Sequence, residues 1–169
     1  MILSTERMEL IALTPHQIQL WVDDLPTLEK ELKVTYQGED LSGHFGNIVR
    51  SQALIAAEKK ADYVWDTFWF FVEKTERIVM GSACFKGTPD SEGSVEIGYG
   101  ISPDFERKGL TTEAVQALVS WAFLDYRVQI VRAETLKENL ASQAIVKKCG
   151  MVYDRETEEC YWWQIHRAK

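Results

Sequence analysis

The chain has 169 residues and a formal net charge of −7 at pH 7. This length predicts one domain over residues 1–169 that is large enough to bury a core. Hydrophobic residues make up 46% of the chain and charged residues 27%, proportions typical of a soluble globular protein. The negative charge argues against nucleic acid as the main partner and favours cationic substrates, such as amines.

Two features of the sequence predict where the protein works. No stretch approaches the roughly 20 apolar residues that a membrane span requires, and the N-terminus, MILSTERMEL, is charged and lacks the apolar core of a signal peptide. The three cysteines are odd in number and show no CxxC spacing. We therefore expect a reduced, cytoplasmic protein with no membrane partner and no bound metal.

Hydrophobic periodicity and turn residues divide the chain into strands and helices. Thr14 before Pro15 marks a helix start, and Gly150 marks a helix end. The order β-αα-βββ-α-β-α-ββ predicts an α/β fold with a mixed, mostly antiparallel sheet of about six to seven strands and helices on both faces. The expected elements are a strand at Met8–Leu13, two helices between Pro15 and Trp65 broken by a loop at Gly38–Gly46, strands at Thr67–Glu73, Ile78–Phe85 and Ser94–Ile101, a helix from Thr111 to about Tyr126, a strand at Val128–Leu136, a helix at Asn139–Cys149, and strands at Met151–Arg155 and Cys160–His166.

The strand at Ser94–Ile101 carries two glycines. Glu96, Gly98 and Gly100 share one face, and Tyr99 lies on the opposite face with apolar neighbours. Glycines in a central strand indicate either a bulge needed for packing or the close approach of a ligand. If a ligand approaches the strand, Glu96 lies beside that ligand. If the glycines only form a bulge, Glu96 is a carboxylate on a solvated surface.

The turn that follows is basic and leads directly into a helix. Gly109 lets the backbone curl, while Arg107 and Lys108 add positive charge and Thr111 and Thr112 add hydroxyl donors. A strand–turn–helix junction of this kind directs backbone N–H groups at one spot and predicts a phosphate site. The turn is neither the GxxxxGK of a nucleotide P-loop nor the GxGxxG of a dinucleotide fold, so a nucleotide-binding enzyme is a distant alternative.

A third segment, ENLASQAIVKKCG, places Asn139 and Ser142 at the spacing of a helix cap and a third helical position. By itself this spacing predicts no more than a capped helix. Cys149, beside the terminating Gly150, is interpreted as a core residue rather than a nucleophile.

Together these segments resemble a known family. IGYGISPDFERKGLTTEA is similar to the cofactor-binding motif of the GCN5-related N-acetyltransferases (GNAT), and NLASQAIVKKCGM is similar to their following motif. The opening STERMEL resembles the start of the RimJ/RimL-like branch. The resemblance implies a single GNAT acetyltransferase domain over residues 1–169. It also implies direct transfer of an acetyl group from acetyl-CoA to a primary amine, on a small molecule or a protein N-terminus, in a ternary complex.

The resemblance also implies roles for individual residues. The Tyr99 N–H polarises the thioester carbonyl, Ser142 is a candidate proton donor to the leaving thiolate, and Glu96 is the first choice for the base that takes the amine proton. The residues implied in cofactor binding are Ile101, Arg107, Lys108, Gly109, Leu110, Thr111, Thr112, Asn139 and Ser142.

Some positions depart from the family pattern. Glu106 stands where the family has Gln or Arg, Thr111 where it has Gly or Ala, and Val146 where many members have a tyrosine. These departures leave open a second hypothesis, a catalytically degenerate CoA-binding or regulatory protein. Several aromatic residues either line an acceptor pocket or fill the core. They are Trp21, Tyr36, Phe45, Trp69 and Tyr161-Trp162-Trp163. The number of aromatic residues is compatible with a homodimer.

Overall fold

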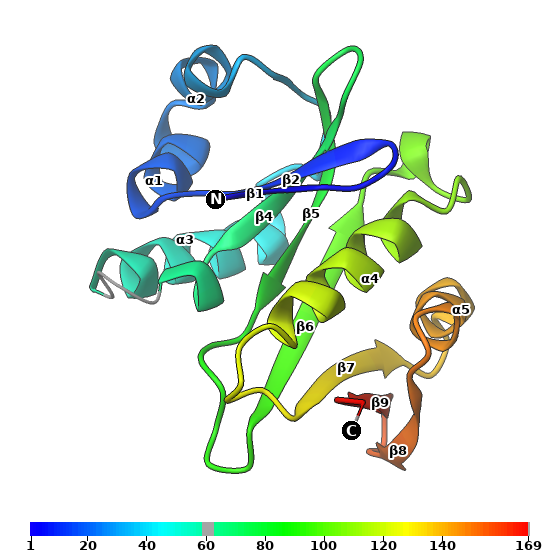
Figure 1. The fold of residues 1–169 in the computed structure, drawn as a ribbon. Coiled ribbons are helices and arrows are strands. Elements are labelled where there is room, and N and C mark those ends of the chain that lie inside the picture. The colour runs from blue at the N-terminus through cyan, green and yellow to red at the C-terminus, as the bar shows by residue number, and fades with distance from the viewer. Residues whose placement is uncertain (59–62, 169) are drawn as a thin grey trace.

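The computed structural model, drawn in Figure 1, describes residues 1–58 and 63–168. Its elements follow the predicted order with additions near the N-terminus. The strands are β1 (Ile2–Ser4), β2 (Met8–Ala12), β3 (Thr35–Tyr36), β4 (Phe68–Glu73), β5 (Ile78–Phe85), β6 (Ser94–Ile101), β7 (Ile130–Leu136), β8 (Val152–Glu156) and β9 (Cys160–His166). The helices are α1 (Pro15–Asp23), α2 (Leu25–Leu32), α3 (Gly43–Glu58), α4 (Leu110–Ala122) and α5 (Leu140–Lys148), with short 3-10 turns η1 (Tyr63–Trp65) and η2 (Pro103–Phe105).

The strands form one mixed sheet in the order β1-β2-β4-β5-β6-β7-β9-β8, with β3 paired to β5. Only the β3–β5 and β6–β7 pairs among the described strands are parallel, which confirms the predicted mixed, mostly antiparallel sheet. The described residues form nine strands, more than predicted. The two extra strands, β1 and β3, are three and two residues long, too short to show a recognisable periodicity.

The N-terminal region holds three helices in the described residues rather than the two predicted. The third, α3, begins at Gly43, inside the segment Gly38–Gly46 that was expected to be a loop. Gly46 lies within this helix. A Cβ there would overlap the backbone carbonyl of Leu41, so this glycine permits the close approach of the chain that leads into the helix. The helical expectation for residues 59–62 lies outside the described residues.

Helices cover both faces of the sheet, as predicted: α4 and α5 lie on one face, and α1 to α3 on the other (Figure 1). Successive side chains of strand β4 pack against the helices on opposite faces of the sheet. Trp69 contacts Trp121 of α4, with ring centroids 4.9 Å apart, whereas the neighbouring Phe68 and Phe70 contact Trp21 of α1. Trp21 and Trp69 are fully buried, so these two aromatic residues belong to the core and do not wall a pocket.

The parallel strands β6 and β7 separate along their length. Their pairing joins Ser94–Glu96 to Ile130–Arg132 and, within the described residues, extends no further. On its other edge β6 remains paired with β5 as far as Ile101. The second half of β6 therefore has one free edge in the middle of the sheet, on the side where α4 begins (Figure 1).

The free edge belongs to the odd-numbered residues of β6. The Glu96 C=O accepts a hydrogen bond and the Ser102 N–H donates one on the β5 side. Because backbone groups alternate in direction along a strand, Tyr99 and Ile101 direct their N–H and C=O groups away from β5, toward the gap that β7 leaves. These groups are available to an extended ligand.

In the described part of the chain, no helix is both long and apolar enough to cross a membrane. Over the same residues, no group of His, Cys, Asp and Glu side chains could hold a metal ion. The thiols of Cys84, Cys149 and Cys160 are free. Burial raises the pKa of Cys149 to about 11, so its sulfur stays a thiol and behaves as a small core residue, as predicted.

Candidate active site

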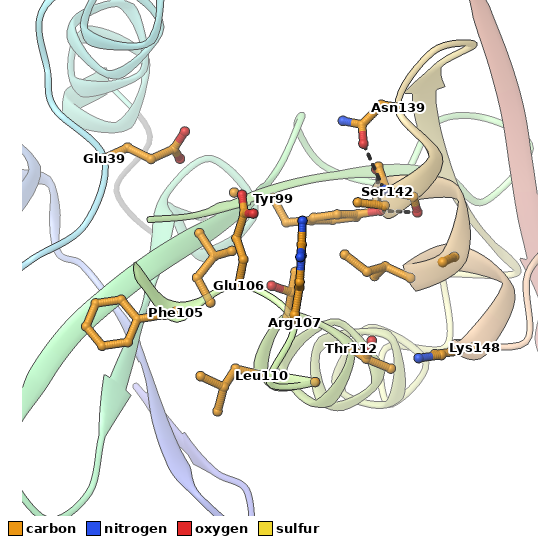
Figure 2. A pocket seen from close by; sticks show the side chains of 17 residues that line it. Glu39, Tyr99, Phe105, Glu106, Arg107, Leu110, Thr112, Asn139, Ser142 and Lys148 are labelled. Atoms are coloured by element: carbon orange, nitrogen blue, oxygen red, sulfur yellow. Dashed lines mark hydrogen bonds between the residues drawn. The ribbon is translucent and has the colours of Figure 1, made fainter. Parts of the chain in front are cut away.

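A cavity of about 600 Å³ opens where β6 and β7 separate. The second half of β6, the loop before α4, the first turn of α4 and one side of α5 form its walls (Figure 2). The fold thus brings together residues from motifs that are about 40 positions apart in the sequence. The predicted site residues that line the cavity are Tyr99, Ile101, Arg107, Gly109, Leu110, Thr111, Thr112, Asn139 and Ser142.

The helix α4 begins without a side-chain cap. The side chains of Thr14, Asp24 and Asn139 cap α1, α2 and α5, whereas the N-cap position of α4 is Gly109, which has no side chain to do so. The first backbone bond of α4 runs from the Glu113 N–H to the Gly109 C=O. The N–H groups of residues 110–112 therefore have no hydrogen-bond partner inside the helix and form its positive end. Such an arrangement binds anions.

The loop that leads into α4 has an unusual backbone. Gly109 has φ 74° and Arg107 has φ 61°, both in the left-handed region. Glycine adopts this conformation at no steric cost, but an arginine does so at some cost, and such residues concentrate at functional sites. The Arg107 side chain reaches from the loop toward Tyr99 in the middle of the cavity (Figure 2).

Tyr99 and α5 are joined by hydrogen bonds. The Tyr99 hydroxyl lies 2.9 Å from Ser142 Oγ and donates to the Ser142 backbone oxygen at 3.3 Å. The Ser142 N–H in turn donates to Asn139 Oδ1 at 2.9 Å (Figure 2). Burial raises the pKa of Tyr99 to about 12, so its hydroxyl stays protonated at neutral pH and holds Ser142 in place.

One carboxylate in the cavity was not anticipated from the sequence. Glu39, in the loop between β3 and α3, lines the cavity on the opposite side of Tyr99 from Ser142 (Figure 2). A Cβ at Gly100 would overlap the Glu39 carboxylate, so Gly100 permits this approach. Tyr36 supports the loop by donating its hydroxyl to the Glu39 backbone oxygen at 2.6 Å.

Burial raises the pKa of Glu39 above its ordinary value. The glycines of β6 were the only sequence signal for this contact, because they predicted that something approaches the strand closely. A bulge does not explain them, since the β5–β6 register shows no shift. In this structure the group that approaches Gly100 is a side chain of the same protein.

Two predicted site residues do not line the cavity. Glu96 forms an ion pair with Lys86 and lies four residues from Gly100, about 13 Å along the strand. The Lys108 ammonium turns to the Asp104 backbone oxygen, at 2.9 Å. Lys148, at the end of α5, lines the cavity but was missed because a cation in the last turn of a helix is common.

The charges in the cavity are segregated. Arg107 and Lys148 lie near the start of α4, while Glu39 lies on the far side of Tyr99 (Figure 2). Glu106, where the family pattern has Gln or Arg, also lines the cavity. The cationic end suits an anionic group, and the acidic end suits an amine.

A separated strand pair beside an uncapped helix start is suited to an extended anionic ligand held against a strand edge. A family model described as an acetyltransferase (GNAT) domain matches residues 20–152. The chain therefore belongs to the GNAT acetyltransferase family and is an acyltransferase.

Individual relatives agree with this assignment. An uncharacterized N-acetyltransferase, YjdG of Bacillus subtilis (strain 168), is 27% identical over 164 residues, 91% of this chain and 97% of the relative. The ribosomal-protein-S5-alanine acetyltransferase of Vibrio fischeri has the same fold, with TM-score 0.72 at 13% identity, over 98% of this chain and 96% of that one. RimL, a ribosomal L7/L12 α-N-protein acetyltransferase solved with coenzyme A, has TM-score 0.69 at 13% identity over 98% of each chain. In its fold the chain thus resembles the RimJ/RimL-like branch, the resemblance that its opening segment had predicted.

Proposed function

We propose that this protein is an acetyl-CoA-dependent N-acetyltransferase that moves the acetyl group directly to a primary amine in a ternary complex. The observation that carries the proposal is the uncapped start of α4 at one end of the gap between β6 and β7. A helix start with free N–H groups is suited to a diphosphate, and a free strand edge is suited to an extended amide chain.

The described residues fit coenzyme A in this position. The N–H groups of Gly109 to Thr112, with the side chains of Arg107 and Lys148, would hold the diphosphate. The backbone groups of Tyr99 and Ile101 would pair with the pantetheine amides. Lys108 would contact the diphosphate only through its backbone, since its ammonium is hydrogen-bonded to the Asp104 backbone oxygen. When bound, the thioester supplies the activated acetyl group.

Three groups of this chain would then act on the reaction. The Tyr99 N–H donates to the carbonyl oxygen as charge develops on it, and a single donor of this kind contributes about 3 kcal/mol. Ser142 Oγ, held by the Tyr99 hydroxyl, gives a proton to the leaving sulfur. Glu39 takes the proton from the amine nitrogen as that nitrogen bonds to the acetyl carbon, and its raised pKa makes it a stronger base.

The acceptor is a primary amine, either on a small molecule or at a protein N-terminus. Glu39 attracts the ammonium form of such a group electrostatically before it is deprotonated. The position where many relatives have a tyrosine is occupied by Val146, which is fully buried and does not line the cavity. The proton donor in this chain is therefore assigned to α5, at Ser142.

The test is release of the CoA thiol from acetyl-CoA in the presence of amines, polyamines, amino acids and N-terminal peptides. We expect turnover with at least one amine class. Two isosteric variants, Gly109→Asn and Gly109→Asp, serve as the matched pair, because both residue types tolerate a left-handed φ. Only the second adds a negative charge at the helix start, so it should lose CoA binding by calorimetry while Gly109→Asn retains more of it.

Two outcomes would contradict the proposal. Absence of CoA and acetyl-CoA binding to the wild-type protein would exclude the whole assignment. Binding without turnover across the complete amine panel would instead support a catalytically degenerate CoA-binding protein.

A further inference from the structure

The turn between β1 and β2 is bonded to the loop that precedes α4. The Arg7 backbone N–H donates to Glu113 Oε1 at 2.9 Å, and its Nε donates to Oε2 of the same carboxylate at 2.7 Å. The Arg7 Nη1 donates to the backbone oxygen of Lys108 at 2.8 Å. One residue near the N-terminus thus joins both the helix and the loop, 101 to 106 positions further along the chain.

The bond to Lys108 fixes the direction of a neighbouring N–H group. In a trans peptide the C=O and the following N–H point in opposite directions. Because Arg7 holds the Lys108 oxygen, the Gly109 N–H is directed away from Arg7. Gly109 lines the cavity, and a Cβ placed on it would lie 3.6 Å from Arg7 Nη2, so the guanidinium lies against the loop at this glycine.

The bond to Glu113 has an electrostatic consequence. Glu113 lies in the first turn of α4, at the same positive helix end that the proposed diphosphate uses. Partial burial raises the pKa of Glu113, but the hydrogen bonds from Thr5 and Arg7 and the charge of Arg7 outweigh this and lower it. The carboxylate is therefore ionised at neutral pH, and Arg7 is the cation that balances it beside the anion site.

We propose that Arg7 is a positioning residue of the cofactor site. It aims the Gly109 N–H by holding the Lys108 carbonyl, and it neutralises Glu113 so that the start of α4 can accept a diphosphate. This inference rests on the proposed function for the identity of the ligand. The Arg7 side chain is 45% exposed, and ion pairs this exposed contribute little to folding stability, so variants should remain folded.

The experiment measures CoA dissociation constants by calorimetry for Arg7→Ala, Arg7→Lys, Glu113→Gln and the double variant Arg7→Ala/Glu113→Gln. The matched control is Lys74→Ala, because the Lys74 ammonium binds the backbone oxygens of Thr5 and Glu6 in the same turn. Lys74→Ala removes the same charge and loosens the same hairpin, but Lys74 has no bond to Lys108 or Glu113 among the described residues.

We expect Arg7→Ala to weaken CoA binding about tenfold, as the loss of charge-assisted hydrogen bonds implies. The double variant should recover part of this loss, because the unbalanced carboxylate is gone. Arg7→Lys should fall between wild type and Arg7→Ala, since lysine keeps the charge but not the guanidinium fork. In turnover, Arg7→Ala should raise KM for acetyl-CoA and leave KM for the amine unchanged.

Unchanged CoA affinity in Arg7→Ala would overturn the inference while leaving the proposed function intact, since the wild-type protein would still bind CoA. Equal weakening by Lys74→Ala and Arg7→Ala would also overturn it, because the effect would then come from the hairpin as a whole. A double variant no tighter than Arg7→Ala would overturn the electrostatic half. Wild-type protein that binds no CoA would overturn both the proposed function and this inference.

Discussion

Glu39 and Glu96 differ in what surrounds their carboxylates. Glu39 lines the cavity, and its carboxylate has no hydrogen-bond or ion-pair partner within the described residues. Glu96 is paired with Lys86 outside the cavity. A base must be free to accept a proton, and the Glu96 carboxylate is occupied by the Lys86 ammonium. At the scale of single residues, the environment therefore favours Glu39, whereas Glu96 as the base remains the prediction from the sequence.

Isosteric substitution of each glutamate by glutamine can show which of the two is the base. We expect Glu39→Gln to lower kcat/KM for the amine by about 10²- to 10⁴-fold, the usual contribution of a general base. Because a protonated Glu39 cannot accept a proton, wild-type activity should rise with pH through its raised pKa. Glu39→Gln should lose this rise at acidic pH. The measurement is a pH profile of kcat/KM.

Glu96→Gln is the matched control, because it makes the same chemical change on the same face of the sheet. It should leave the rate and the pH profile essentially unchanged. If Glu96→Gln instead removes activity and Glu39→Gln does not, the base is Glu96, as the sequence predicted.

At the scale of elements, α4 and α5 begin in contrasting ways. The start of α5 is satisfied internally, because Asn139 Oδ1 accepts the Ser142 N–H. The start of α4 has no such cap and faces the cavity. The start of α4 is thus free to bind a ligand, while the start of α5 is fixed by its cap so that Ser142 remains beside Tyr99.

Removing the cap of α5 should affect both stability and catalysis. We expect Asn139→Ala to reduce the free energy of unfolding by about 1 kcal/mol, and to lower kcat further because Ser142 is no longer held. The measurements are chemical denaturation and kcat at saturating substrates.

The control is Thr14→Ala, which removes the cap of α1, where Thr14 Oγ1 accepts the Gln17 N–H at 3.2 Å. Thr14→Ala should cost a similar free energy without a matching loss of kcat. Equal losses of kcat in both variants would assign Asn139 a structural role alone.

At the scale of the whole molecule, the sheet is split where the ligand is expected. Only three residue pairs join β6 to β7 among the described strands, so the β7–β9–β8 portion is linked to the rest by few strand bonds, with α4 and α5 packed beside them (Figure 1). A ligand that binds β6, α4 and α5 together would connect the two portions. The cytoplasmic localisation and the homodimer remain predictions.

Cofactor binding should therefore stabilise the entire protein. At a CoA concentration 100 times its dissociation constant, we expect about 2.7 kcal/mol of added stability, which raises Tm by roughly 5 to 10 °C for a chain of this size. Differential scanning calorimetry with and without CoA measures the shift. Phosphate-free fragments of CoA such as pantetheine, which lack the diphosphate, should raise Tm by less. An equal rise in Tm would argue against the role assigned to the start of α4.

Much of the fold was predictable because its signals are local. The alternation in β6 predicted this strand with the bounds that the structure shows, Ser94–Ile101, and the predicted bounds of β9, Cys160–His166, also match. The cap at Asn139 was predicted from its spacing to Ser142. By contrast, α3 was partly missed because Gly43 and Gly46 were interpreted as loop residues, although the second is needed for the close approach of Leu41 to the helix.

The sequence by itself determined the family, the order of the elements from β4 onward and most of the residues around the cavity, because the strand–turn–helix junction and the capped helix are each encoded within a few neighbouring positions. Only the tertiary structure decided which distant side chains join them. Glu39 reaches Gly100, and Arg7 reaches Lys108 and Glu113, through contacts between segments far apart in the chain. Such contacts depend on how helices and hairpins pack on the sheet, and no periodicity or local spacing records that packing.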